Sequence, residues 1–316
     1  MAKMSQTVKE IIQIVVFLIV AGTLVVVFAI YPLGRAKVFL ARTDIEEFNA
    51  DSLPTNDISA LADLPAQIDT FRVDTDGLTS LACAYLTPTP DSSRPDDSTG
   101  RAGLVILIHD EESDRTSMIP LAARLLEHDF SVCLYDQRAS GFSSGLYHSD
   151  GEYEAADLTE LVAYLGIRDR IVHPCVAVGW SAGADAALLA MDEEPRLEGV
   201  VAIDPYITTE RWLDHLIAEH DMYWIPFRHT LLKFWYELRS GYAPAYRDID
   251  NVPIPNRPAL LLVDNDKLSD ETLVRYLAAS GDAGVKLSAK PGDFDQLAES
   301  ITGFIGLIAA THISEP

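Results

Sequence analysis

The stretch that decides the fold is CVAVGWSAGADAALLAM, residues 175–191. It begins with an apolar run of strand length and ends in an alanine- and leucine-rich run typical of a helix. Between them stands GWSAG, a G-x-S-x-G motif. A serine on such a sharp strand-to-helix turn has its hydroxyl lifted above the sheet. Ser181 is therefore the candidate nucleophile, and the N–H of Ala182 is the candidate donor to a developing oxyanion.

Short apolar runs alternate with helical patterns on both sides of this motif. The clearest strand candidates are LACAYL, GLVILIHD, SVCLYD, GVVAID and ALLLVDN. Strands of about five residues separated by longer helices predict an α/β protein with a mostly parallel, doubly wound sheet. Residues 205–255 interrupt the alternation with many aromatic side chains, which favours a helical cap over one end of the sheet or simple packing filler.

The N-terminal region contains eighteen residues without a charge, IVVFLIVAGTLVVVFAIY, at positions 14–31. A run of this length predicts one transmembrane helix at 11–33, preceded by a short tail at 1–10. Residues 34–67 are then a tether or docking segment, and 68–316 form the globular domain. The pattern fits a signal-anchor of a single-pass membrane protein, with the globular domain outside the cytoplasm and the helix available to a membrane-protein partner.

Charge and cysteine content exclude several function classes. The chain has 316 residues and a formal net charge of −24, so phosphate backbones are repelled and nucleic acid is not an expected partner. The three cysteines, Cys83, Cys133 and Cys175, lie in apolar runs and are expected to be small core residues. No metal-ligand spacing or phosphate-binding glycine loop is present, so neither a metal nor a cofactor is expected.

Taken together, the motifs resemble the α/β-hydrolase superfamily, within it the anchored serine hydrolases that include Bem46-like and acylpeptidase-like members. The resemblance rests on LVILIHD, on DQRASGFSSG at 136–145, on GWSAG and on RPALLLVDND at 257–266. It implies an eight-stranded sheet and acyl transfer to water by a serine, acid and histidine triad. Trp180 and His109 are implied to lie beside Ser181.

Two departures from the family pattern predict an incomplete triad. The acid is matched by Asp266, with Asp270 as the second choice, but Asp293 stands where the family has its histidine. A carboxylate next to another carboxylate is a poor proton shuttle. Where the family's oxyanion loop has small residues, this chain has Asp110, Glu111 and Glu112, whose charges oppose a developing oxyanion.

Two functions therefore remain open from the sequence. The favoured one is a catalytically impaired hydrolase fold that binds a ligand or serves as an accessory subunit of a membrane assembly. The alternative is an active serine hydrolase that cleaves ester, amide or peptide bonds through Ser181 and binds an apolar acyl or peptide group. The alternative requires one of the other histidines to complete the triad.

Overall fold

The larger part of the chain is an α/β unit built on one sheet. The structure is a computed structural model, and it describes residues 6–36, 61–75, 77, 79–89, 101–240, 247–281 and 284–314. Contacts divide the chain into two compact units, which are described separately. One unit comprises residues 1–39 and 213–242, and the other comprises 40–212 and 243–316.

The sheet of the larger unit has eight strands in the order β1-β2-β4-β3-β5-β6-β7-β8. β2 pairs antiparallel with β1 and β4, and all other pairs are parallel. The predicted mostly parallel sheet of eight strands is thereby confirmed. The strands are β1 (Ala66–Asp74), β2 (Ser80–Pro88), β3 (Leu104–Ile108), β4 (Ser131–Tyr135), β5 (Cys175–Trp180), β6 (Gly199–Ile203), β7 (Ala259–Val263) and β8 (Val285–Ala289).

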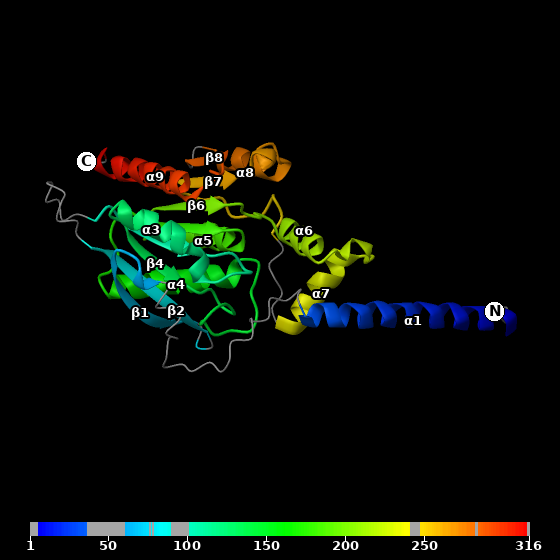
Figure 1. The fold of residues 1–316 in the computed structure, drawn as a ribbon. Helices are drawn as coiled ribbons and strands as arrows, with labels where there is room; N and C mark the ends of the chain where they lie inside the picture. The colour runs from blue at the N-terminus through cyan, green and yellow to red at the C-terminus, as the bar shows by residue number, and fades with distance from the viewer. Residues whose placement is uncertain are drawn as a thin grey trace. The chain divides into compact units, whose positions relative to one another are not determined.

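Helices cover both faces of the sheet, as the doubly wound prediction requires (Figure 1). Because successive side chains of a strand point to opposite faces, Ile106 of β3 joins one buried cluster and Leu107 joins the other. The first cluster packs under α4 (Glu152–Ile167), α5 (Ala182–Glu193) and α8 (Glu271–Ser280), and the second under α3 (Ile119–Glu127) and α9 (Phe294–Ser314). The strands interior to the sheet are therefore apolar on both faces.

Short connections complete the unit and include the single-turn helices η1 (Arg115–Met118) and η3 (Asn265–Lys267), while η2 (Met222–Trp224) belongs to the smaller unit. The cysteines are free thiols buried in the core, which confirms their expected role as core residues. Leu61, which belongs to the expected tether, is buried in the cluster under α3 and α9. The rest of the tether up to residue 60 lies largely outside the described residues.

The smaller unit contains the long N-terminal helix α1 (Gln6–Ala36), most of α6 (Thr209–Glu219), and α7 (Arg228–Ser240). Within it, His229 Nε2 lies 2.9 Å from Asp214 Oδ1. Apolar side chains of α1 are exposed, among them Ile14 and Phe17, which is 69% exposed. The aromatic insertion thus contains two helices.

The structure does not confirm a transmembrane helix. Among the described residues, no helix has both the length and the apolar character needed to cross a membrane. The apolar run predicted to span at 11–33 lies within α1, but the side chains after Leu24 lie outside the described residues. The helix itself is present, so the prediction was right about secondary structure and remains unsupported about the membrane.

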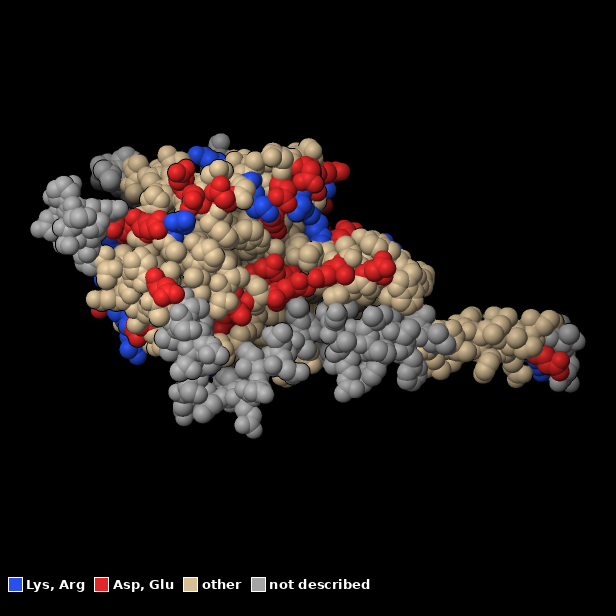
Figure 2. Space-filling model, in the orientation of Figure 1, with Lys and Arg blue, Asp and Glu red and all other residues tan. Residues whose placement is uncertain are grey.

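The visible surface of the protein carries more acidic than basic side chains, in keeping with the net charge of −24 (Figure 2). Red carboxylates are spread over much of the drawn face, and blue side chains occur in smaller groups among them. Such a surface attracts cations and repels anions.

Candidate functional site

Ser181 stands on a strained turn between β5 and α5. Its backbone angles are φ 50° and ψ −117°, in a region that L-residues rarely adopt. The turn is possible only because glycines stand two positions before and two positions after Ser181. A Cβ on Gly179 would lie 2.1 Å from the carbonyl oxygen of Gly183, and a Cβ on Gly183 would lie 2.4 Å from that of His109. The predicted strand, sharp turn and helix are all present.

The Ser181 side chain is half-buried, and no general base is bonded to it. Its backbone N–H donates to the Ile203 carbonyl oxygen over 2.8 Å. Its hydroxyl makes no hydrogen bond with any residue that the structure describes, a histidine included. A serine hydroxyl is a weak nucleophile without a base within hydrogen-bond reach. Activation of Ser181 would therefore require a base that no described residue supplies through a hydrogen bond in this arrangement.

Glu111 contacts the Ala182 N–H, the donor that the sequence assigns to the oxyanion hole. Its Oε2 accepts the Ala182 N–H over 3.3 Å, and its Oε1 accepts the Tyr206 hydroxyl over 2.9 Å. The side chain is 3% exposed. Burial, reinforced by the charge of Asp110, raises the pKa of Glu111 to about 8. At neutral pH a largely protonated carboxyl group therefore fills the hole with its own oxygens.

His109 lies in the loop before Glu111, and hydrogen bonds to the backbone occupy both of its ring nitrogens. It is fully buried, its Nε2 accepts the Gln137 N–H over 2.9 Å, and its Nδ1 donates to the Asp110 carbonyl oxygen over 2.5 Å. The burial lowers the pKa of His109. A neutral imidazole with both nitrogens bonded to the backbone holds the loop in shape.

A group of alternating charges lies at the carboxyl ends of β5, β6, β7 and β8. Lys290, directly after β8, is paired with Asp204, its Nζ is 3.1 Å from Asp264 Oδ1, and it lies 5.5 Å from the centre of the Trp180 ring. Lys267 Nζ adds a contact of 3.5 Å to Asp204 Oδ1. Burial alone would lower the pKa of Lys290, but its bonds to Asp204 and Asp264 raise it. Lys290 is therefore a cation at neutral pH and cannot accept a proton from Ser181.

The three acids that the sequence considers for the triad are each exposed or make contacts with residues other than a histidine. Asp266 lies exposed in η3 and forms no ion pair or side-chain hydrogen bond with the described part of the chain. Asp270 caps α8 by accepting the Leu273 N–H, and its Oδ1 lies 3.4 Å from Arg211. Asp293 is exposed and caps α9 by accepting the Gln296 N–H over 2.8 Å. None of these contacts joins an acid to a histidine.

A buried Ser–His–Glu arrangement occurs elsewhere, in the loop after β4. His148 Nε2 lies 3.0 Å from Ser140 Oγ, and its Nδ1 lies 3.7 Å from Glu154 Oε1. All three side chains are at most 6% exposed. Burial raises the pKa of Glu154, but the hydrogen bond and charge of His148 and the charge of Arg138 outweigh it and lower the pKa to about 2. These contacts between His148 and Glu154 tie the loop to α4.

The sequence singled out Glu111 only as one of three acids and missed Tyr206 and Lys290. The signal for Lys290 was its place directly after a strand, where parallel sheets present side chains to ligands. Tyr206 lies just after β6 and had the same signal. In the described residues there is no cluster of three or more His, Cys, Asp or Glu side chains that could hold a metal ion.

Comparison with known proteins identifies the family of the chain and supports its fold. The profile of the serine aminopeptidase S33 family matches residues 100–280, more than half of the chain. The chain belongs to the serine aminopeptidase S33 family. The matched segment includes the elbow, the oxyanion loop and β7, so this S33 chain shares the α/β-hydrolase scaffold around Ser181. No curated protein sequence matches it significantly.

Solved structures of α/β-hydrolases share the fold of this S33 chain at low sequence identity. The Pyrococcus furiosus esterase Pf2001 superposes with a TM-score of 0.59 and 18% identity, over 85% of this chain and 98% of the esterase. The α/β-hydrolase GrgF from Penicillium sp. sh18 gives 0.56 and 16%, over 78% and 100%. The proline iminopeptidase of Mycobacterium smegmatis gives 0.53 and 13%, over 77% and 100%. At these identities the likeness establishes the fold alone.

Proposed function

We propose that this S33 chain is a catalytically impaired member of its family that acts by binding, as a ligand-binding or accessory subunit. The observation that carries the proposal is the Glu111 carboxyl group on the Ala182 N–H. Catalysis of acyl transfer needs that donor for the oxyanion, and removing one such donor costs about 100- to 1000-fold in rate. Here the donor is present but already occupied by the protein's own side chain.

The base side of the site supports the same proposal. The expected histidine position holds Asp293, which caps α9. The Lys290 ammonium group lies among Asp204 and Asp264, near Trp180. A cation in this place neutralises the acids that would otherwise orient an imidazole. Loss of a base and of a free oxyanion donor are independent defects, and each costs orders of magnitude in rate.

The alternative function, an active serine hydrolase, is favoured by the elbow itself. The strained Ser181 conformation is kept, although backbone strain of this kind costs about 1–3 kcal/mol. An active enzyme would require Glu111 to leave the Ala182 N–H and a base to reach Ser181. Its substrate would then be an ester, amide or peptide with an apolar acyl group.

Fluorophosphonate labelling separates these two functions. The full chain is compared with Ser181→Ala, Asp293→His and the double variant Asp293→His/Glu111→Ala, with an active serine hydrolase as the reagent control. We expect no labelling of the folded wild-type protein and the first detectable labelling in the double variant. Strong labelling of the wild type that disappears only in Ser181→Ala would overturn the proposal and establish an activated serine.

We also propose that α1 attaches the protein to a membrane, with the globular domain outside the cytoplasm and a membrane protein as a further partner. Support comes from the exposed apolar side chains of α1, including Ile14, Phe17 and Leu18. Isolated apolar patches of this size mark membrane or protein contacts. We expect alkaline extraction to leave the full chain in the membrane pellet and to release a Phe17→Glu/Leu18→Glu variant. Protease treatment of intact cells then tests the side, and cross-linking tests the protein partner.

A further inference from the structure

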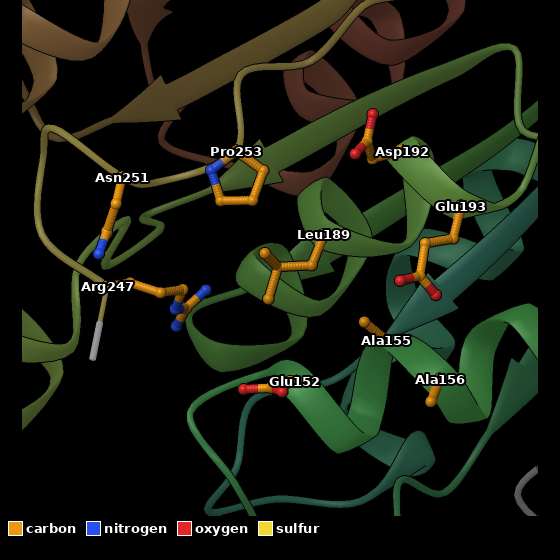
Figure 3. Close-up of a pocket in the computed structure, with 9 residues that line it drawn as sticks. All are labelled: Glu152, Ala155, Ala156, Leu189, Asp192, Glu193, Arg247, Asn251 and Pro253. Atoms are coloured by element: carbon orange, nitrogen blue, oxygen red, sulfur yellow. The ribbon is translucent and has the colours of Figure 1, made fainter. Parts of the chain in front are cut away.

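A small pocket lies between α4, α5 and the segment at 247–253, and none of the residues around Ser181 lines it (Figure 3). Its volume is about 290 Å³, near the lower end of the range for ligand sites, so it fits a small metabolite rather than a large one. The first turns of α4 supply Ala155, α5 supplies Leu189, and the loop supplies Pro253. These apolar side chains surround the middle of the pocket.

Arg247 lines one end of the pocket, and two of its donors, Nε and Nη1, have no acceptor among the described residues. It is 6% exposed, its Nη2 donates to the Asp150 carbonyl oxygen, and it pairs with Asp150 Oδ2 over 3.4 Å. Nε is buried without a partner, and Nη1 makes no hydrogen bond with the residues that the structure describes. Burying a guanidinium group with unused donors is costly. The open end of Arg247 therefore fits an acceptor supplied by a ligand.

The position of Arg247 is fixed by its surroundings. Its backbone N–H donates to Thr209 Oγ1 over 3.1 Å, and the same hydroxyl donates to Asp150 Oδ2 over 2.7 Å. The Thr209 N–H in turn donates to the Arg247 carbonyl oxygen over 3.0 Å. A guanidinium group held in this way loses little conformational entropy on binding an anion.

Two carboxylates lie beyond Leu189 from Arg247, at the end of α5 (Figure 3). Asp192 and Glu193 are exposed, and neither forms a hydrogen bond or ion pair with the described residues. A helix rises about 1.5 Å per residue, so Glu193 lies ~6 Å along α5 from Leu189. Opposite charges therefore stand at the two ends of the pocket, which Glu152, an exposed third carboxylate, and Asn251 also line.

We propose that this pocket binds a linear zwitterion whose carboxylate and ammonium groups are separated by a short hydrocarbon chain, as in an ω-amino acid. The carboxylate bonds to the free donors of Arg247, the methylene groups pack on Leu189, Ala155 and Pro253, and the ammonium group lies beside Asp192 and Glu193. An α-amino acid with an uncharged side chain cannot place its charges at both ends, because its carboxylate and ammonium groups are bonded to the same carbon atom.

The test is calorimetric titration of the full chain with 6-aminohexanoate and three matched probes. L-norleucine is its isomer with adjacent charges, hexanoate lacks the ammonium group, and hexylamine lacks the carboxylate. We expect 6-aminohexanoate to bind at least about tenfold more tightly than each matched probe, a difference of ~1.4 kcal/mol. Equal affinity for norleucine, or no heat from 6-aminohexanoate at about 10 mM, would overturn the proposal.

Substitutions that leave the core intact test whether 6-aminohexanoate binds in this pocket. Asp192→Asn/Glu193→Gln removes two exposed charges and should weaken 6-aminohexanoate binding by about three- to tenfold, as expected for partly solvated charge pairs. Glu299→Gln, an exposed acid on α9, and Ser181→Ala are the controls and should leave the affinity unchanged. An unchanged affinity in the double variant would refute the assignment of the ammonium end. Loss of binding in Ser181→Ala would move the ligand to the elbow.

Discussion

At the scale of one residue, Glu111 joins the loop after β3 to the elbow and to the segment after β6. Its two oxygens accept hydrogen bonds from the Ala182 N–H and the Tyr206 hydroxyl. The folded protein keeps the Glu111 proton up to about pH 8, whereas the unfolded chain releases it near the usual value of 4.5. Between these pH values the folded state binds more protons, so the free energy of unfolding falls as the pH rises.

Replacing Glu111 by glutamine should remove that pH dependence. We expect the wild type to lose on the order of 2–5 kcal/mol of stability between pH 4.5 and 8 through this group, and Glu111→Gln to lose much less. At pH 5 the variant should be less stable by about 1–2 kcal/mol, because an amide offers only one acceptor to two donors. Urea unfolding across this pH range measures both effects. Glu112→Gln, an exposed neighbour, is the control, and identical pH profiles for Glu111→Gln and wild type would contradict the account.

The pKa of Glu154 is shifted in the opposite direction, so this residue affects the stability of the protein at acid pH. Its pKa of about 2 lies below the usual 4.5, so its contribution to stability is complete above pH 4.5 and is lost as the pH falls to about 2. We expect about 3 kcal/mol to be lost in this window. Glu154→Gln should show a shallower loss there and a lower stability at pH 7, since an amide nitrogen would replace one of the two carboxylate oxygens that accept hydrogen bonds from Ser149. Circular dichroism at a series of acid pH values checks this, with exposed Glu160→Gln as the control.

At the scale of elements, the glycines of the elbow and of α9 have different roles. Gly179 has no room for a Cβ, which would meet Gly183 at 2.1 Å, whereas Gly306 in α9 has no atom within 4 Å of that position. We expect Gly179→Ala to destabilise the protein by at least about 3 kcal/mol and Gly306→Ala to stabilise it by about 0.5–1 kcal/mol. Thermal unfolding of the two variants decides this. A mild effect of Gly179→Ala would mean that the turn is more open than described.

Much of this element structure could be predicted because it depends on local patterns. The apolar runs of β3 and β5 and the G-x-S-x-G turn carry their own spacing, and all of them are present in the structure. The contacts of Glu111, Tyr206 and Lys290 could not be predicted, because they join segments far apart in the chain. A sequence pattern gives the side of the sheet on which a side chain emerges but not the partner that it meets there. That is why the acidic loop was noticed and its occupation of the Ala182 N–H was not.

At the scale of the whole molecule, the net charge of −24 should determine how salt affects stability. Repulsion among surface carboxylates destabilises the compact state, and salt screens it. The Debye length falls from about 30 Å at 0.01 M to about 8 Å at 0.15 M, so most of the gain should come below 0.15 M sodium chloride. We expect the urea midpoint of the full chain at pH 7.5 to rise steeply over that range and to level off above it. A rise that stays linear to 1 M would indicate exclusion of salt from the surface instead. Repeating the titration at pH 4.5, near the sequence pI, supplies the control, since the net charge and therefore the salt response should then be small.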